Sequence, residues 1–331
     1  FWLKFFGSAS SVELRIYAKL HTSILFCLDT SSFAREVTLH IYTYTKMATT
    51  KGSAICSSGC FSFLQPKKTS VAVRSTTASG SMVYESSRAV EEYLHFHYGL
   101  REVPKGLSFA SSAVEFPARM AWIANKYSKE DRRELAYDIG CAVGRGSFEL
   151  ARTFKKVVGI DFSNAFVDAA KKFQKEGSAS YSIMDEGLVK MKKTVELPEG
   201  MDVNRVEFRQ GDACALGDIG LVDCMTAVNL LCRLPEPIAF LEKAIQSIRP
   251  GGILVLVSPY SWLDEYTAQD KWLGGKYDAA GQPISSENQV KAILTPFFDL
   301  VEQHDEPFLI REHSRKFQLG MSDCCVWRRR D

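Results

Sequence analysis

The chain has 331 residues, of which 46% are hydrophobic and 24% are charged, and its formal net charge is +2. This length is sufficient for one large domain with a substantial core, or for one domain with extensions. The near-neutral charge gives no indication of nucleic acid or a charged membrane surface as a partner. No run of about 18 apolar residues exists, which argues against a membrane-spanning helix.

Nine cysteines are scattered along the chain without a C-x-x-C pair. Cys56 and Cys60 could in principle ligate a metal, and Cys324 and Cys325 are adjacent, but these spacings form no zinc or disulfide framework. We therefore expect free thiols in a reducing compartment and no bound metal.

The first part of the chain is expected to be a leader and not part of the folded domain. It does not begin with Met, and residues 37–84 contain no Asp or Glu. Residues 47–82 are rich in Ser and Thr and mildly basic, as organellar transit peptides are. An unstructured tail or translated upstream sequence explains this composition equally well. The expected division is a disordered leader over 1–83 and a folded domain over 84–331, in the cytoplasm, or in a plastid or mitochondrion if 47–82 is a transit peptide.

The folded domain is predicted to start with a helical cap. Glu85–Tyr98 forms an amphipathic helix that places Tyr93 and His97 on one face. A segment rich in Gly, Pro and Ser follows, and a second helix is expected over Met120–Tyr127.

From Leu135 onward, short apolar strands alternate with helices. This alternation predicts a parallel sheet with right-handed crossovers, which is a doubly wound α/β fold. Residues 177–204 interrupt it as an insertion that contains the basic sequence VKMKK. The expected strands are Leu135–Ile139, Lys156–Asp161, a third from Val206, Val222–Val228 and Ile253–Val257, and the expected helices are Gly146–Phe154, Asn164–Lys175 and Pro237–Ile248.

The end of the chain departs from this alternation. Ser286 and Gln289 are predicted to form a capping box for a helix that runs to Leu294. Phe298–His304 and Met321–Trp327 have the pattern of two strands with no helix between them, which predicts an antiparallel hairpin. The expected fold is therefore a Rossmann-like α/β sheet with a parallel core and a C-terminal antiparallel hairpin.

A ligand site is predicted where the first strand ends. Gly140 and Gly144 form a turn between that strand and the next helix, and glycine is needed where backbone approaches a ligand closely. The helix beyond offers unpaired N–H groups to an anionic group. Asp161 ends the second strand, where a carboxylate can bond both hydroxyls of a ribose. Dinucleotide dehydrogenases share this arrangement, so a nicotinamide-dependent oxidoreductase is a rival interpretation.

Three features favour S-adenosylmethionine over a dinucleotide. Asp138 precedes the glycine turn, and a carboxylate there suits the methionine ammonium better than a pyrophosphate. Asp212 follows the third strand, where it can accept a hydrogen bond from the adenine amino group. The antiparallel end of the sheet is typical of methyltransferases and not of dehydrogenases. The residues predicted to bind S-adenosylmethionine, or its product S-adenosylhomocysteine, are Asp138, Gly140, Cys141, Gly144, Asp161, Phe162, Asp212, Ala213 and Asn229.

The sequence also resembles a known family. Four segments are general features of class I methyltransferases: DIGCAVGRGSFELAR, VVGIDFS, RVEFRQGDA and AVNLLCRL. More specific are SPYSWLDEYT, WLGG, PFLIREHSRKFQ and YESSRAVEEYLHFHYG. Together, from about Tyr84 to Arg330, they resemble the methyltransferase domain of ovothiol biosynthesis, a family described as 4-mercaptohistidine N1-methyltransferases.

The long relatives in that family carry an iron-dependent sulfoxide synthase region upstream of this domain. No three-His iron site can be assembled from these 331 residues. The resemblance therefore implies that a separate sulfoxide synthase supplies the thiol.

The resemblance implies methyl transfer from a sulfonium to an imidazole ring nitrogen of 5-thiohistidine (4-mercaptohistidine), the last step of ovothiol biosynthesis. Such a step is an in-line displacement, so the site has to align the two reactants and exclude water. A neutral imidazole nitrogen already has a lone pair, so the site needs to hold the right tautomer more than it needs a strong base. Arg, acidic and aromatic side chains are expected around this small-molecule substrate.

Candidate residues for this chemistry follow the fourth and fifth strands and extend into the hairpin. Asn229 ends the fourth strand, beside the expected position of the transferring methyl group. Arg311 is the candidate for the substrate carboxylate, and His313 or Glu312 for the imidazole or thiol. The expected catalytic residues are Asn229, Tyr260 and His313, and the expected substrate-binding residues are Tyr93, His97, Arg119, Tyr260, Trp262, Thr267, Trp272, Arg311, Glu312 and His313.

Two alternatives to this function stay open at the level of sequence. One is a class I methyltransferase that acts on another small molecule. The other is a binding protein with a methyltransferase fold and no catalysis, since a fold does not guarantee a function. Against the second, Asp161 and both turn glycines are present, and a degenerate site is expected to lose them.

Overall fold

The computed structural model describes residues 6–8, 11–13 and 82–331. The predicted leader over 1–83, with its candidate transit peptide, lies almost entirely outside these residues. Within the described residues, no helix has both the length and the apolar character that crossing a bilayer requires.

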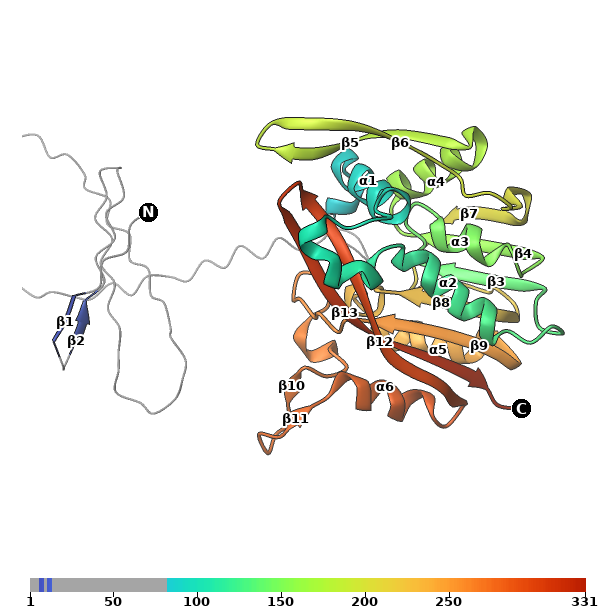
Figure 1. Cartoon of the computed structure of the whole chain (residues 1–331). Helices are drawn as coiled ribbons and strands as arrows, with labels where there is room; N and C mark the ends of the chain where they lie inside the picture. Colours follow the sequence, from blue (N-terminus) through green and yellow to red (C-terminus); the bar gives the residue numbers. More distant parts are fainter. Residues whose placement is uncertain (1–5, 9–10, 14–81) are drawn as a thin grey trace, which may run out of the picture. The chain divides into compact units, whose positions relative to one another are not determined.

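Seven strands form the main sheet of the domain (Figure 1). They are β3 (Leu135–Ile139), β4 (Lys156–Asp161), β7 (Val206–Gln210), β8 (Val222–Val228), β9 (Ile248–Ser258), β12 (Phe298–His313) and β13 (Lys316–Arg329). Their order across the sheet is β12-β13-β9-β8-β3-β4-β7. The five strands from β9 to β7 are parallel, whereas β13 runs antiparallel to both β9 and β12. This confirms the predicted Rossmann-like sheet with a parallel core and a C-terminal antiparallel hairpin.

The helices follow the expected alternation with the strands. The α-helices in residues 82–331 are α1 (Ser87–Leu94), α2 (Phe116–Tyr127), α3 (Arg145–Leu150), α4 (Asn164–Glu176), α5 (Pro237–Ser247) and α6 (Ser286–Leu294). Helical segments of the 3-10 or π type are η1 (Met82–Glu85), η2 (His95–Gly99), η3 (Lys105–Ala113), η4 (Val203–Arg205), η5 (Leu231–Arg233) and η6 (Gln269–Lys271). Three strand pairs of the described residues lie outside the main sheet: β1 (Phe6–Ser8) with β2 (Ser11–Glu13), β10 (Lys276–Tyr277) with β11 (Pro283–Ile284), and the β5–β6 hairpin described below.

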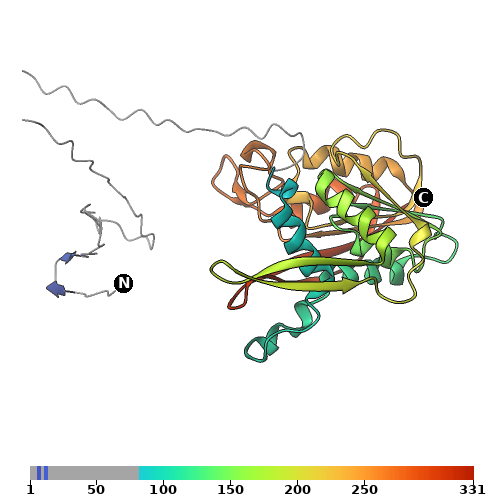
Figure 2. The same ribbon diagram turned by 90° about the horizontal axis from the view of Figure 1, so that it is seen from above.

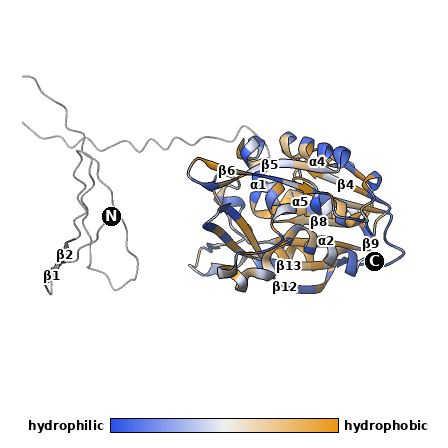
Figure 3. Cartoon of the chain, turned by 45° about the horizontal axis from the view of Figure 1, so that its top comes forward, coloured by the Kyte–Doolittle hydropathy of each residue, from blue (hydrophilic) through white to orange (hydrophobic). Residues whose placement is uncertain are grey.

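Alternate residues of the strands point into two separate apolar layers. On β3, Ala136 packs with α1 to α4, whereas the next residue, Tyr137, packs with α5 and α6. Val255 and Leu256 divide in the same way on β9. The sheet is therefore covered on both faces, which explains the nearly continuous apolar runs of its central strands. Figure 3 shows this hydrophobic colouring along the strands and hydrophilic colouring on the outer turns of the helices.

Capping residues explain where two of the helices begin. The Ser163 hydroxyl accepts a hydrogen bond from Phe166 N and starts α4. For α6 the prediction of Ser286 as the capping residue was wrong by one position. Ser285 is the N-cap, and its hydroxyl accepts from Asn288 N, while the Ser286 hydroxyl accepts from an indole N–H.

The insertion over 177–204 forms a two-stranded antiparallel hairpin, β5 (Ser178–Glu186) and β6 (Val189–Glu196). Figure 2 shows it extending beyond the edge of the main sheet. β6 is exposed along nearly its whole length, so no alternation of buried and exposed residues marked it as a strand. A hydrogen bond of 3.0 Å between His95 Nδ1 and Tyr181 Oη joins the hairpin to η2.

Candidate active site

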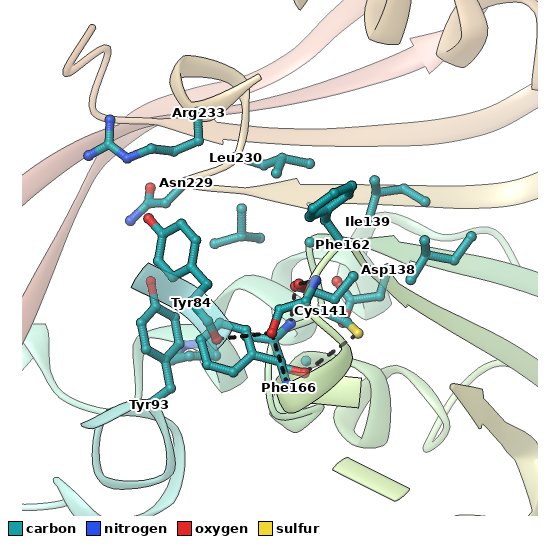
Figure 4. Close-up of a pocket in the computed structure, with 18 of the residues that line it drawn as sticks. Tyr84, Tyr93, Asp138, Ile139, Cys141, Phe162, Phe166, Asn229, Leu230 and Arg233 are labelled. Atoms are coloured by element: carbon teal, nitrogen blue, oxygen red, sulfur yellow. Dashed lines mark hydrogen bonds between the residues drawn. The ribbon is translucent and has the colours of Figure 1, made fainter. Parts of the chain in front are cut away.

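A cavity lies at the carboxyl ends of β3, β4 and β8, bordered by η1, α1 and η2 (Figure 4). The cavity has a volume of about 160 Å³. This edge of a doubly wound sheet is where such folds bind ligands. The predicted site residues that line the cavity are Tyr93, His97, Asp138, Gly140, Cys141, Asp161, Phe162, Ala213 and Asn229.

The glycine turn after β3 adopts left-handed backbone conformations. Gly140 has φ of +76°, Ala142 of +46° and Gly144 of +87°. Gly140 N donates a hydrogen bond of 2.8 Å to Ile160 O, which holds the turn against the end of β4. A Cβ at Gly144 would lie 2.5 Å from Phe208 Cζ, so this position admits glycine alone. Gly144 does not line the cavity; it allows the turn to pack on β7.

The Asp138 carboxylate is buried at the wall of the cavity. It accepts hydrogen bonds from Ser147 Oγ at 2.7 Å and from Thr226 Oγ1 at 2.8 Å. Burial raises the pKa of Asp138, and these two hydrogen bonds oppose the rise. A Cβ at Gly146 would lie 3.0 Å from Asp138 Oδ2, so glycine there leaves the carboxylate open to the cavity. A buried carboxylate of this kind favours a positively charged ligand group.

Asp161 anchors the glycine turn as well as lining the cavity. Its Oδ2 accepts from Ala142 N and its Oδ1 from Ser163 N, both at 2.9 Å. Burial raises the pKa of Asp161 to about 6 despite these two hydrogen bonds. Each carboxylate oxygen has a second lone pair, so two further hydrogen bonds to a ligand remain available.

Asn229 ends β8 with a left-handed φ of +53°, a conformation that is strained for a residue other than glycine and is often found at functional sites. Its N–H donates to Val257 O at 2.8 Å, and its Oδ1 accepts from Ser322 Oγ at 2.7 Å. The side-chain amide donor is free to face the cavity.

The residues expected around an adenine are only partly brought together. Phe162 and Ala213 line the cavity, whereas Asp212 does not. Asp212 Oδ1 accepts from Cys214 N at 2.8 Å and closes a local turn. Its predicted contact with an adenine amino group stays a prediction.

Aromatic rings form the opposite wall of the cavity. Tyr93 is central: its ring lies 4.7 Å from that of Phe166, 6.1 Å from Tyr84 and 6.2 Å from Phe96. Phe96 in turn stacks on Phe116 at 6.2 Å. Burial raises the pKa of Tyr84 and of Tyr93 to about 12, so both phenols are neutral at physiological pH. These residues form an apolar, water-excluding wall, which we call the aromatic wall.

His97 lines the cavity beside the aromatic wall, with its ring 5.7 Å from Tyr93 and 5.5 Å from Phe96. Only 7% of the residue is exposed, and its Nδ1 has no hydrogen-bond partner among the described residues. Burial, and secondarily the charge of Arg145, lowers the pKa of His97 to about 3. The imidazole is therefore neutral.

The charged residues predicted from the C-terminal hairpin do not reach the cavity. Arg311 donates to Met184 O at 2.7 Å on the β5–β6 hairpin, and Glu312 pairs with Lys316 at 2.5 Å. His313 Nδ1 accepts from the backbone N–H of Arg315. The charged residues from Arg311 to Lys316 form the ends of β12 and β13 and the turn between these strands. This pairing directs their side chains toward β5 and solvent.

Arg119 also lies outside the cavity. It pairs with Glu306, donates to Pro307 O, and packs 5.7 Å from the centre of the Phe116 ring. It supports the aromatic wall from behind instead of facing a ligand.

The predicted residues after β9 form a small buried cluster next to α6 and do not line the cavity. Tyr260 donates to Asp323 at 2.9 Å, and Trp262 Nε1 donates to Ser286 Oγ at 2.8 Å. Thr267 Oγ1 donates to Leu234 O, and Trp272 Nε1 to Thr267 O, each at 2.7 Å. All four polar groups are thus satisfied within the protein.

Sequence reasoning missed several lining residues, among them Tyr84, Glu85, Phe166 and Arg233. Glu85 accepts from Asn164 N at 2.9 Å at the start of α4, so it closes the cavity through a contact between distant segments. Arg233 could have been identified from the sequence, because it is a charged residue in an apolar segment directly after a central strand.

No group of three or more His, Cys, Asp or Glu in the described part of the chain is arranged to hold a metal ion. The cysteines at 141, 214, 224, 232, 324 and 325 are free thiols. Cys56 and Cys60 lie outside the described residues.

Comparison with known proteins finds a family model that matches part of the chain and a curated relative. Residues 137–256 match the family model described as "Methyltransferase domain". A curated relative, an uncharacterised 37.1 kDa protein in a transposon of Streptomyces fradiae, is 26% identical over 163 residues, which are 47% of this chain and 40% of that protein.

Among solved structures, this chain is similar to two methyltransferases, in each case with a TM-score below 0.5. The N-methyltransferase NodS from Bradyrhizobium japonicum, in complex with S-adenosyl-L-homocysteine, is 15% identical, with a TM-score of 0.41 and coverage of 73% of this chain and 100% of that one. An S-adenosylmethionine-dependent methyltransferase from Methanosarcina mazei is 18% identical, with a TM-score of 0.42 and coverage of 63% and 97%.

Proposed function

We propose that this chain, which carries a class I S-adenosylmethionine-dependent methyltransferase domain, methylates an imidazole ring nitrogen of 5-thiohistidine. One observation carries the proposal: a single cavity contains both the glycine turn with the carboxylates of Asp138 and Asp161 and the aromatic wall with a neutral histidine. The first half suits the methyl donor, and the second suits a small aromatic acceptor. The resemblance of the flanking segments to the ovothiol family supports this choice of acceptor.

The residues of the first half fit S-adenosylmethionine. Gly140 and Gly146 leave room beside the turn, and Asp138 would face the methionine ammonium. Asp161 keeps two lone pairs for the ribose hydroxyls, and Phe162 would flank the adenine. When bound, this cofactor supplies an electrophilic methyl group on a sulfonium.

The second half would hold the acceptor ring. The flat rings of Tyr93 and Phe166 offer a surface on which an imidazole can stack, and Phe96 and Phe116 close the site to water. Stacking fixes the plane of the ring, so that a ring nitrogen can point along the line of displacement. Asn229 and His97 are the polar groups placed to orient the ring nitrogens and the thiol.

Replacing His97 with Phe should lower kcat/KM at least roughly tenfold, because the hydrogen bond that selects the tautomer is lost. The same change removes a buried, unpartnered polar atom, so the Tm should stay level or rise. Initial rates and thermal unfolding of the same sample check both parts. A fall in Tm that parallels the fall in activity would instead show that His97 acts in packing alone.

The affinity for S-adenosylhomocysteine should fall as the pH is lowered through about 6. Burial raises the pKa of Asp161 to about 6, so the protonated carboxyl becomes the major form below that pH and loses acceptor capacity for the ribose. Above this pH the affinity should be level, and below it the affinity should drop about tenfold per pH unit. Calorimetric titrations between about pH 5 and pH 8 measure this, and Asp161→Asn should remove the dependence.

A methyl-transfer assay on the full chain tests the proposed function. We expect S-adenosylhomocysteine formation with 5-thiohistidine and much slower formation with plain histidine, with the product's methylated nitrogen located by NMR. Turnover of plain histidine or of an unrelated thiol in preference to 5-thiohistidine would assign the enzyme to another small molecule. We further propose that a separate sulfoxide synthase supplies the thiolated substrate.

A further inference from the structure

The cavity contains one positively charged side chain among its lining residues. Glu85, Asp138 and Asp161 are the acidic ones, and Arg233 is the cation. The neutral His97 adds no charge. Arg311 and Arg119, which the sequence suggested for a substrate carboxylate, bond Met184 O and Glu306 instead. An acceptor that carries a carboxylate therefore finds its counter-charge at Arg233.

Arg233 is half-buried but has no carboxylate partner in residues 82–331. Arg145 and Arg311 each form an ion pair, whereas Arg133, Arg328 and Arg329 are also half-buried and bond backbone carbonyls. Removing a guanidinium from water without a counter-ion costs free energy, and a bound anion offsets that cost. The missing counter-ion alone does not distinguish Arg233 from these arginines; its place in the lining of the cavity does.

The guanidinium of Arg233 is held in a defined orientation. Nη1 donates to Ser261 O at 2.6 Å and to Cys232 O at 3.3 Å. Its Cζ lies 4.7 Å from the centre of the Tyr266 ring, which in turn is 6.3 Å from Tyr84. These contacts fix the plane of the group before a ligand arrives, which favours a two-pronged bond to a carboxylate.

The position of Arg233 points to the acceptor and not to the cofactor. Figure 4 shows Arg233 beside Asn229 and over Tyr84, on the side of the cavity away from Asp138 and Phe162. We propose that Arg233 binds the carboxylate of the methyl acceptor and so restricts the enzyme to amino acids with a free carboxylate. This rests on the proposed function, because it takes the acceptor to be an amino acid.

The test compares 5-thiohistidine with its decarboxylated analogue, a thiolated histamine, in the full chain. The variants are Arg233→Gln, which keeps a planar polar group without the charge, and Arg233→Lys, which keeps the charge without the paired N–H donors of a guanidinium. The matched control is Arg329→Gln, because Arg329 also stacks on aromatic rings and donates to a backbone carbonyl but lies outside the cavity. Calorimetry with S-adenosylhomocysteine is measured on each protein.

The unmodified chain should prefer 5-thiohistidine in kcat/KM by roughly 30- to 100-fold. Arg233→Gln should lose most of that preference through a raised KM, Arg233→Lys should keep an intermediate part, and Arg329→Gln all of it. S-adenosylhomocysteine affinity should change less than about threefold in all of them. If Arg233→Gln retains the preference for 5-thiohistidine, the assignment is overturned. It is also overturned if either variant weakens the binding of S-adenosylhomocysteine as strongly as that of the acceptor, because Arg233 would then bind the carboxylate of the cofactor.

The two proposals fail in different ways. Absence of turnover of both thiolated compounds by the unmodified chain overturns the proposed function, and the assignment of Arg233 with it. If 5-thiohistidine is methylated but the preference over thiolated histamine does not depend on Arg233, only the assignment of Arg233 is overturned. Should Arg233→Gln unfold, Arg233→Lys decides the question by its intermediate or unchanged preference.

Discussion

Replacing Gly144 with Ala is expected to lower the free energy of unfolding by about 3 kcal/mol and to weaken S-adenosylhomocysteine binding by more than about tenfold. Two costs combine in this estimate. The backbone is left-handed, with φ of +87°, which costs a residue with a Cβ about 1 to 2 kcal/mol. The new Cβ would also lie 2.5 Å from Phe208 Cζ, and overpacking of a core costs about 1 to 3 kcal/mol.

Gly177→Ala provides the matched control for this prediction. Gly177 has a similar φ of +72°, but no atom lies within 4 Å of the position of a new Cβ. It should therefore lose only about 1 kcal/mol and bind S-adenosylhomocysteine normally. Urea unfolding and calorimetry measure both quantities. Equal losses in the two variants would mean that contact with Phe208 does not restrict the glycine turn.

Replacing Asp161 with Ala is expected to weaken S-adenosylhomocysteine binding roughly 100-fold. The variant loses the two remaining acceptor positions toward the ribose, and hydrogen bonds to a charged group contribute about 1.5 to 3 kcal/mol each. It also frees the N–H groups of Ala142 and Ser163, which Asp161 holds at 2.9 Å. The glycine turn should then lose its fixed position, and hydrogen exchange at the amide of Ala142 should become faster.

Asp212→Ala is the control for this second prediction. Asp212 also follows a strand of the sheet and also accepts a backbone N–H, from Cys214, but it does not line the cavity. Its removal should change S-adenosylhomocysteine affinity less than about threefold. A loss as large as that of Asp161→Ala would restore the adenine role that the sequence suggested for Asp212.

The core of the fold could be predicted because its strands are buried on both faces. Ile253–Val257 is apolar throughout, and Val222–Val228 is apolar except for Asp223 and Thr226, a pattern typical of strands covered on both faces. The first and last residues of the strands were harder to predict from the sequence. β9 already starts at Ile248, because that residue pairs with Val222 before a register shift at Pro250 and the two glycines that follow it. The β5–β6 hairpin was missed because its exposed strands carry no core pattern.

Most of the donor half of the candidate site was predictable, whereas of the aromatic wall and its histidine only Tyr93 and His97 were expected. Asp138, Gly140 and Asp161 follow strands whose carboxyl ends meet at one edge of the sheet, so strand order alone brings them together. The aromatic wall depends on packing between distant segments, such as Tyr84 on Phe166 at 5.8 Å. No local pattern reveals such contacts.

The choice of arginine shows the same limit. Arg311 has a suitable residue type and lies in a family-specific segment, but the long β12–β13 pairing directs it to the β5–β6 hairpin. Arg233 occupies the cavity because η5 follows β8 directly. Residue type indicated the chemistry, and the three-dimensional arrangement moved the proposed role from Arg311 to Arg233, which sequence reasoning had missed.

The measurement that tests the central claim most directly is a sequential calorimetric titration of the full chain. S-adenosylhomocysteine is added first, and 5-thiohistidine is then titrated into the loaded protein. We expect one S-adenosylhomocysteine per chain, followed by one 5-thiohistidine that binds more tightly than plain histidine, since the two halves of the cavity adjoin. Failure of S-adenosylhomocysteine to bind, or competition between the two ligands for one place, would contradict a cavity that holds donor and acceptor side by side.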